Sequence, residues 1–350
     1  MTAALKYLYP EHLMLVYGSG GCGKSTLLAN MAAYAFKTFG LKTRIVGADG
    51  GGTKPFQVLM KKGVVEYWAI DLWDKDLWTT YDRATKGWWP EDLSIPNSKL
   101  LPPYEKHSLC PGCGERMGAP TSCRACKKAI TPGATVKQEL EPLNGFEEVG
   151  CIGFESIAAF GFNIMARLRV IEKPANLMTI TDEEAPEARI AQSAQHHYGI
   201  AQAKVQEWVA NTRRLPVWAV AWTTLELRGG DDGYGKPVYG PALPGKKLTA
   251  LCTPWFTDVM HVELEPGDEK VVQKSEDGKG EVVKTVPKVD RVLYLADHFP
   301  ADTKPYGFKA KTSVPGMPVR IPAPAGTNNM TTFFNEIEEA YKREEANLGF

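Results

Sequence analysis

Residues 18–26 read GSGGCGKST, and this stretch constrains the fold more than any other. Gly18, Gly23, Lys24 and Ser25 fit the pattern G-x-x-x-x-G-K-[ST], in which successive backbone N–H groups point at a phosphate. The lysine supplies a positive charge for β- and γ-phosphates, and the serine hydroxyl is a ligand for Mg2+. We therefore expect phosphate contacts from the whole stretch, namely Gly18, Ser19, Gly20, Gly21, Cys22, Gly23, Lys24, Ser25 and Thr26.

The residues around this loop favour the motif over a chance glycine-rich turn. The apolar run 12–17 predicts a short buried strand, as the motif requires before the loop. From Thr26 onward, Leu27, Met31 and Ala35 recur at helical spacing until Gly40, a typical helix end. The positive end of this helix would therefore face the phosphates.

Composition limits the classes of protein that remain. The chain has 350 residues, of which 43 % are hydrophobic and 23 % charged, so we expect a packed core. Its formal net charge is zero, and any nucleic-acid contact must come from a local patch. No apolar run approaches the roughly 18 residues of a membrane span, and the N-terminus lacks the apolar region of a signal peptide. We expect a cytoplasmic protein with no membrane segment.

Four of the seven cysteines form two C-x-x-C pairs, Cys110 with Cys113 and Cys123 with Cys126. In a cytoplasmic chain this spacing favours a metal over disulfides. Four thiolates close a tetrahedral Zn2+ site with no open position, so we predict a structural zinc ribbon. Two redox pairs, or free thiols, are the alternative interpretation.

The cysteines lie in a segment of different character, from about residue 73 to residue 145, which is rich in proline and tryptophan. A core of that size is marginal by itself, and we expect the metal to hold it. On either side, residues 42–49 and 147–156 are predicted strands that carry an acid at the end, Asp49 and Glu155. Asp49 could position water or metal, or it could be a turn residue, since three glycines follow it.

The second half of the chain continues the alternation of strands and helices. Residues 157–171 predict a helix, and residues 216–226 predict an apolar strand that ends in Thr223, Thr224 and Glu226. Residues 228–247 are rich in glycine and proline, and a loop of that length is usually functional or disordered.

Three further features complete the chain. A hairpin is predicted with its turn near residues 277–278, and the segment 306–316 carries Lys309 and Lys311. The C-terminal residues predict an amphipathic helix with an apolar stripe of Met330, Phe333, Phe334, Ile337 and Tyr341. We favour docking of this helix on its own domain over a contact with a partner.

The order of these features resembles the RecA-like ATPase core. The resemblance is closest to the small bacteriophage RecA-like proteins of single-strand annealing and recombination, and it covers residues 10–72 and 146–322. It implies an α/β fold: a RecA-like P-loop NTPase core with a mainly parallel sheet, an inserted four-cysteine zinc ribbon and a C-terminal amphipathic helix. The implied domains are residues 1–72 and 146–325 for the core, 73–145 for the ribbon and 326–350 for the helix.

By this resemblance, two acids take family roles. Asp49 falls where the family has its water-activating carboxylate, which is normally a glutamate. Glu155 and Ser156 fall where the family has Asp-Ser at the end of its Mg2+-associated strand, so Glu155 and Ser25 are the candidate Mg2+ ligands. One acid is shorter than the family pattern and the other is longer, and the identity of the catalytic base stays open between them.

The resemblance also implies DNA-facing and subunit-facing segments. Residues 196–208 resemble the family's first DNA-binding loop and the helix after it, and residues 233–247 resemble the second. Lys236, Lys246 and Lys247 would then be available for phosphates, although a plain linker is the alternative.

The resemblance assigns roles to residues at two further places. Thr223, Thr224 and Glu226 fall where the family senses the γ-phosphate. Lys309 and Lys311 match paired lysines that reach into a neighbour's ATP site, although they could be solvated lysines. The catalytic candidates are therefore Lys24, Asp49, Glu155, Thr223, Glu226, Lys309 and Lys311.

The expected function is ATP binding and hydrolysis coupled to DNA, in particular single-stranded DNA in recombination, annealing or repair. The expected cofactors are ATP, Mg2+ and Zn2+. A homo-oligomer, either a ring or a filament, is implied because active sites of this class lie between subunits. Two alternatives stay open: a nucleotide-dependent scaffold protein with slow turnover, and a P-loop kinase.

Overall fold

The computed structural model describes residues 10–48, 50–72, 76–117, 125–127, 138–143, 145–171, 195–231, 237–244, 249, 251–274, 281–298, 308–323 and 329–348. Five residues named above lie outside these ranges: Asp49, Cys123, Lys236, Lys246 and Lys247.

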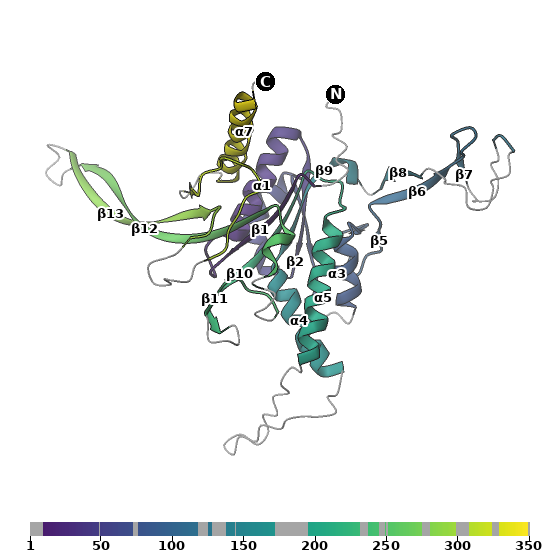
Figure 1. Ribbon diagram of the computed structural model, residues 1–350, viewed down its shortest axis with the longest axis horizontal. Coiled ribbons are helices and arrows are strands. Elements are labelled where there is room, and N and C mark those ends of the chain that lie inside the picture. Colours follow the sequence, from purple (N-terminus) through teal and green to yellow (C-terminus); the bar gives the residue numbers. More distant parts are fainter. Residues whose placement is uncertain are drawn as a thin grey trace, which may run out of the picture.

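One large sheet organises the described residues (Figure 1). Its strand order is β14-β13-β12-β1-β10-β9-β2-β3, and the six strands from β12 to β3 are parallel to one another. These six are β1 (His12–Gly18), β2 (Lys42–Gly47), β3 (Val65–Ala69), β9 (Val149–Glu155), β10 (Ala219–Asp231) and β12 (Asp258–Lys274). Three antiparallel strands complete the sheet: β11 (Pro237–Pro241), β13 (Glu281–Tyr294) and β14 (Arg320–Ala323). The mainly parallel α/β fold expected from the sequence is confirmed.

Helices cover both faces of the sheet. On one face lie α1 (Lys24–Phe39) and α7 (Asn329–Leu348), whose rings Tyr34 and Phe334 stack at 4.8 Å. On the other face lie α3 (Leu77–Thr85), α4 (Ile157–Ile171) and α5 (Gln195–Thr212), which meet around the fully buried Tyr81. The remaining short helices are η1 (Gly50–Phe56), α2 (Gln57–Lys61), η2 (Phe146–Glu148) and η3 (Thr253–Trp255). None of the helices in the described ranges is both long and apolar enough to cross a membrane.

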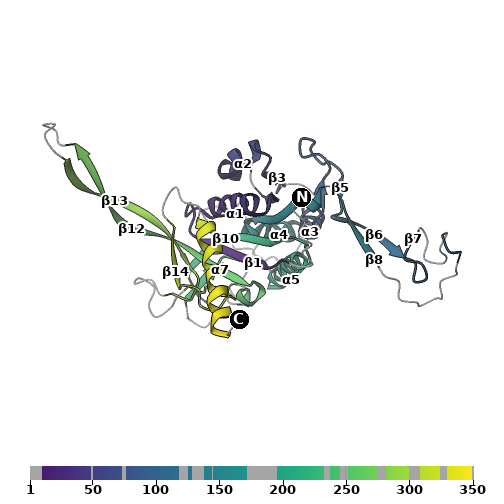
Figure 2. The same ribbon diagram turned by 90° about the horizontal axis from the view of Figure 1, so that it is seen from above.

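Two arms extend from opposite ends of the molecule (Figures 1 and 2). One is the outer part of the β12–β13 hairpin. The other is a three-stranded sheet of β6 (Tyr104–Leu109), β7 (Arg116–Met117) and β8 (Gln138–Pro142). A small pair, β4 (Trp89–Pro90) and β5 (Leu100–Leu101), lies at the base of this second arm. Within the segment 73–145, therefore, α3 packs into the main core, and only the later residues form the arm.

Several segments differ from the sequence expectation. Residues 228–247 were expected to be a loop, but β10 continues to Asp231 and pairs with β11, because an antiparallel return satisfies backbone groups that a loop would expose. The predicted hairpin is formed by β12 and β13, which pair from His261 with Tyr294 to Lys274 with Glu281, and its turn lies outside the described residues. Of the apolar stripe on α7, Tyr341 is 52 % exposed rather than buried.

Candidate nucleotide-binding site

The phosphate loop follows β1 directly and leads into α1, in the order that the motif requires. Glycine is needed at two of its positions. A Cβ at Gly18 would overlap the carbonyl oxygen of Val262 on the neighbouring strand β12. Gly23 has a φ of 94°, a left-handed conformation that residues with a side chain avoid, and it forms the N-cap of α1. The loop therefore lies at the carboxyl ends of the parallel strands, and its backbone adopts conformations that require glycine.

Lys24 is the first residue of α1, and its ammonium group folds back over the loop. The Nζ atom donates hydrogen bonds to the carbonyl oxygens of Gly18 at 3.0 Å and Ser19 at 2.7 Å. Ser25 and Thr26 follow in the first helical turn and are partly exposed. The lysine charge, the helix N-terminus and the serine hydroxyl thus come from the same turn, as phosphate and Mg2+ binding requires.

A second cation, which the sequence analysis missed, lies against the same loop. Arg291 on β13 donates from Nε to the carbonyl oxygen of Cys22 at 2.8 Å, and its guanidinium fills the space beside Gly23. Burial lowers the pKa of Arg291. Residue 291 is 269 positions from Cys22 in sequence, so no local pattern could reveal this contact.

Glu155 lies at the end of β9, two strands away from β1 across β10. Its Oε2 atom accepts a hydrogen bond from the Tyr67 hydroxyl at 3.0 Å, and the side chain is only 7 % exposed. The next residue, Ser156, donates its backbone N–H to the Thr223 hydroxyl at 2.9 Å. Thr223 pairs in register with Val16, two residues before the phosphate loop. The structure therefore brings Glu155 and Thr223 to the carboxyl ends of the parallel strands, beside the phosphate loop. Ligands of parallel α/β folds bind at this end of the sheet.

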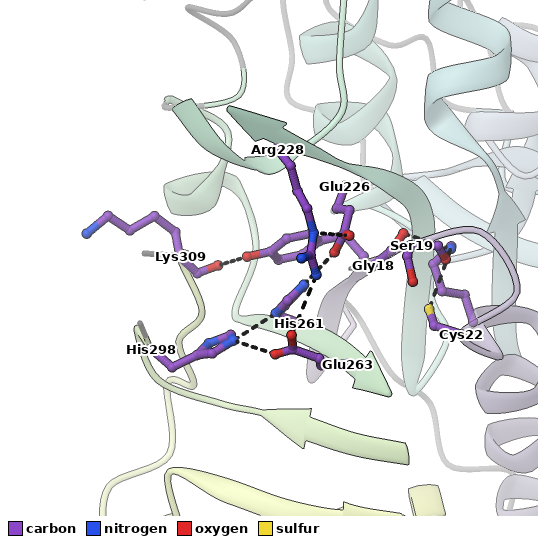
Figure 3. A network of polar contacts seen from close by, with 11 residues as sticks. Gly18, Ser19, Cys22, Glu226, Arg228, His261, Glu263, His298 and Lys309 are labelled. Atoms are coloured by element: carbon purple, nitrogen blue, oxygen red, sulfur yellow. Dashed lines mark hydrogen bonds and ion pairs between the residues drawn. The ribbon is translucent and has the colours of Figure 1, made fainter. Parts of the chain in front are cut away.

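Glu226 lies further along β10 and takes part in a polar network rather than pointing freely at the loop (Figure 3). Its carboxylate accepts from Arg228 Nε at 2.6 Å and from His261 Nε2 at 2.8 Å. Burial opposes the ionisation of Glu226, but these two donors outweigh it and hold the pKa of the carboxyl below its usual value. The nearby Thr224 hydroxyl donates to the carbonyl of Ala242 at 2.7 Å.

The same network continues through residues that the sequence analysis did not select (Figure 3). His261 Nδ1 lies 3.0 Å from His298 Nε2, which in turn lies 3.4 Å from a carboxylate oxygen of Glu263. The other oxygen of Glu263 lies 3.5 Å from Arg228. Burial lowers the pKa of His261 despite its carboxylate partner. Histidine and glutamate in separate segments gave no motif, and only the fold brings them together.

Lys309 and Lys311 lie in an extended segment that forms isolated bridges rather than a strand. Lys309 is exposed, and its ammonium pairs with Asp297 at 2.5 Å, while its carbonyl accepts from the Tyr17 hydroxyl at 2.7 Å. Its side chain points away from the histidine network (Figure 3). Within the chain, therefore, Lys309 is not directed at the phosphate loop.

Three of the four ribbon cysteines come together in the arm, and Cys123 lies outside the described residues. The sulfur atoms of Cys110, Cys113 and Cys126 lie within 4.8 Å of one another. The backbone N–H of Gly112 donates to the Cys110 sulfur at 3.4 Å, and this bond is the main cause that lowers the pKa of the Cys110 thiol to about 6. Thiolates are the form that binds Zn2+, so the three thiols fit a metal.

No protein family matches the chain, and no curated protein sequence matches it. Among solved structures, the crystal structure of the RadB recombinase aligns with 84 % of this chain and 88 % of its own, at 11 % sequence identity and a TM-score of 0.35. That score is too low to support an argument about function. The proposals below rest on the residues of this chain.

Proposed function

We propose that the protein binds and hydrolyses ATP with Mg2+ in a RecA-like core, and that it acts on single-stranded DNA. The observation that carries the nucleotide part is the convergence of Lys24 and Arg291 on the N-terminus of α1. Among the described residues, neither cation has a carboxylate within ion-pair distance. Two cations beside the positive end of a helix repel one another. An anion bound between them offsets this repulsion, and a polyphosphate is such an anion.

The loop residues fit the groups that ATP would bring. Backbone N–H groups of residues 20–25 would hold the phosphates, and Lys24 would neutralise their charge. Mg2+ would be held by the Ser25 hydroxyl, with Glu155 near it at the end of β9. When bound, this ion stabilises the negative charge that develops on the transferred phosphoryl group.

Hydrolysis also needs a group that orients water. Asp49 and Glu155 are the two candidates, and Asp49 lies outside the described residues. Glu155 accepts a hydrogen bond from Tyr67, which fixes its side chain and leaves it at the strand end where water could be positioned. The base assignment is therefore part of the proposal: Asp49 for water and Glu155 for Mg2+, or Glu155 for both.

DNA contact is proposed for the region after β10. The β10–β11 hairpin extends from the same sheet edge as the phosphate loop, and the segment that follows β11 contains Lys246 and Lys247. Glu226 and Arg228 at the base of this hairpin connect it to the network beside the loop. Lysines in such a segment suit the phosphate backbone of a single strand.

Oligomer formation is proposed from the paired lysines. Lys309 does not face its own phosphate loop. If it acts in catalysis, it therefore contacts the phosphate loop of a neighbouring subunit. The double replacement Lys309→Ala/Lys311→Ala should then reduce hydrolysis by about 10³-fold or more while ATP affinity changes little. Mixing this variant with Lys24→Ala subunits should restore some turnover, because shared interfaces recombine the intact parts. Absence of rescue in confirmed assemblies would contradict the trans arrangement.

The decisive experiment measures ATP turnover by the full chain with and without single-stranded DNA. The proposal expects turnover that rises when DNA is added and that is lost in Lys24→Ala. Tight ATP binding without turnover in either condition would favour the scaffold alternative. A phosphorylated small-molecule product would favour a kinase.

The cysteine cluster is proposed to hold one Zn2+ with a structural role, with Cys123 as the fourth ligand. Elemental analysis of protein purified without added metal should show zinc, and Cys113→Ser/Cys126→Ser should contain one ion per chain fewer than the wild type. Retention of all zinc by that variant would contradict the proposal.

A further inference from the structure

A second cluster of metal-binding side chains lies beside the phosphate loop, in addition to the cysteines. Single donor atoms of His261, Glu263 and His298 all lie within 4.8 Å of one another. We propose that these three residues bind one divalent transition-metal ion of the Zn2+ class. The inference does not depend on the proposed ATPase activity, because the site is defined without nucleotide.

The proton arrangement of the cluster favours an ion. The Glu226 carboxylate can only accept, so His261 must carry its proton on Nε2, and His261 Nδ1 presents a lone pair. The single Nε2 atom of His298 then faces two acceptors, His261 Nδ1 at 3.0 Å and Glu263 Oε2 at 3.4 Å. One N–H cannot serve both acceptors well, whereas a metal ion accepts a lone pair from all three groups.

His298 is able to present such a lone pair. Its side chain is 9 % exposed, and its other nitrogen, Nδ1, has no hydrogen-bond partner among the described residues. In the metal-free protein the two acceptors favour a proton on Nε2, so an ion that binds at Nε2 must move this proton to Nδ1. The His298 ring stacks on Tyr294 at 3.6 Å between centroids with an angle of 5°, which holds its plane in place.

The distances suit metal coordination. With nitrogen–metal bonds of about 2.1 Å, two nitrogens 3.0 Å apart subtend roughly 90° at the ion. A small widening gives a tetrahedral angle, and three protein ligands leave at least one further position for water. Imidazole nitrogens with a carboxylate suit Zn2+ and related ions better than Mg2+, which prefers oxygen ligands.

Glu226 gives the cluster a further feature of metal sites. Histidines that bind metals commonly donate their remaining N–H to a carboxylate, which fixes the tautomer and orients the ring. His261 does this with Glu226 at 2.8 Å. The charge of the cluster also favours a cation. Among the described residues, Arg228 is the one partner of Glu226 and Glu263 within 4 Å besides the two histidines. With neutral histidines the cluster has a net negative charge that a cation would balance.

This ion would be separate from the nucleotide's Mg2+. Met260 and Val262, on either side of His261 in β12, pack in the core on the α1 face of the sheet. Because side chains alternate along a strand, His261 and Glu263 face the opposite side, where His261 contacts Tyr17 at 4.7 Å between rings. The phosphate loop and the cluster thus lie at the same carboxyl end of the sheet but on opposite faces of it.

The test uses the full chain with all four ribbon cysteines replaced by serine, and Co2+ and Zn2+ as probes. We expect one ion per chain, with visible Co2+ bands of the intensity typical of four-coordinate sites and no near-ultraviolet thiolate band. His298→Ala and Glu263→Gln should lose the ion. Glu226→Gln should weaken its affinity by roughly 10- to 100-fold, since it removes only the orienting carboxylate.

The matched control is His12→Gln. His12 is also a buried histidine near a carboxylate, with Nδ1 3.7 Å from Asp258, but no second histidine faces it among the described residues. Metal content should be unchanged in this variant.

If the cysteine-free protein does not fold, the comparison is made in the wild-type background, where His298→Ala and Glu263→Gln should each reduce total bound metal by one ion per chain. Circular dichroism confirms that each variant is folded. Unchanged metal content in both folded variants, or no ion in the folded cysteine-free protein, would overturn the proposal.

Discussion

Two histidine–carboxylate clusters lie at opposite ends of β1 and of residues 258–262 of β12, which pair with it, and they differ in how completely the chain satisfies them. At the amino end, Asp258 is fully buried and accepts hydrogen bonds from the hydroxyls of Thr312 at 2.7 Å and Thr257 at 2.9 Å. It also accepts from the backbone N–H of Ser313 at 3.3 Å, and His12 lies 3.7 Å away. The Asp258 carboxylate is thus held by donors of its own chain, although the Thr257 hydroxyl also donates to the carbonyl oxygen of Leu13.

At the carboxyl end, the polar groups are less completely matched. Among the described residues, Lys24 donates to two carbonyl oxygens of the loop and to the Cys22 sulfur, and Arg291 donates to the carbonyl oxygen of Cys22. His298 shares one nitrogen between two acceptors. Burying charges without full pairing is costly, and such arrangements are typical of functional sites. The comparison shows that the same residue types stabilise the fold at one end of the sheet and are available for ligands at the other.

The largest expected effect comes from the amino end. Asp258→Ala should lower the free energy of unfolding by about 3–5 kcal/mol, because it leaves buried donors without an acceptor. Urea denaturation measures this change. ATP affinity of the folded protein should stay unchanged. A loss of ATP affinity with normal stability would reverse the assignment of the two ends.

At the carboxyl end, Arg291→Ala should weaken ATP binding more than it weakens the fold. Hydrogen bonds to charged groups contribute about 1.5–3 kcal/mol, so ATP affinity should fall by roughly 10- to 100-fold. The nucleotide-free protein should lose at most about 1.5 kcal/mol of stability, since one hydrogen bond to Cys22 disappears. Titration calorimetry gives the affinities, and Arg320→Ala is the control, since Arg320 pairs with Glu265 on the exposed surface. Equal ATP affinities of the Arg291 variant and the wild type would contradict a role for Arg291 in ATP binding.

Lowering the pH should reduce the stability that Asp258 contributes at the amino end of β1. Burial opposes the ionisation of Asp258, but His12, which lies 3.7 Å away, and the hydrogen bond from Thr312 outweigh it and hold the pKa of its carboxyl below its usual value. A lowered pKa means that the unfolded chain takes up this proton first as the pH falls. The stabilisation is therefore complete above about pH 5 and is lost below about pH 4, at no more than about 1.4 kcal/mol per pH unit.

The control for this effect is Asp258→Asn, which has no carboxyl to titrate. Its melting temperature should depend less on pH between 5 and 2 than that of the wild type. Parallel pH profiles of the two proteins would contradict the role given to Asp258.

The sequence predicted the parts of this fold that depend on local pattern. The loop at 18–26 and its flanking strand and helix were predicted because glycines, a lysine and apolar periodicity lie within thirty residues. Helix α4 was predicted with its observed bounds, Ile157–Ile171. Strand β10 was extended beyond Glu226 in the structure, because pairing with β11 overrides the weak strand preference of Arg228–Asp231.

The remaining site residues could not be predicted for a physical reason. Arg291, His261 and His298 reach the loop edge through long-range strand pairing, and their sequence neighbours form no recognisable motif. Lys309 and Lys311 lie in a segment whose described residues form isolated bridges, and their role at a neighbour's site stays a prediction. Contacts between distant segments are set by topology, which the one-dimensional pattern does not contain.

The most direct test of the account is the ATP affinity of Lys24→Ala measured beside Lys37→Ala. Both lysines belong to α1, but Lys24 folds over the phosphate loop, and Lys37 lies exposed in the last turn. We expect Lys24→Ala to lose about 100-fold or more in ATP affinity and Lys37→Ala to bind ATP as the wild type does. Both variants should unfold at the wild-type urea concentration. Equal affinity in the folded Lys24 variant would contradict the assignment of this sheet edge as a nucleotide site.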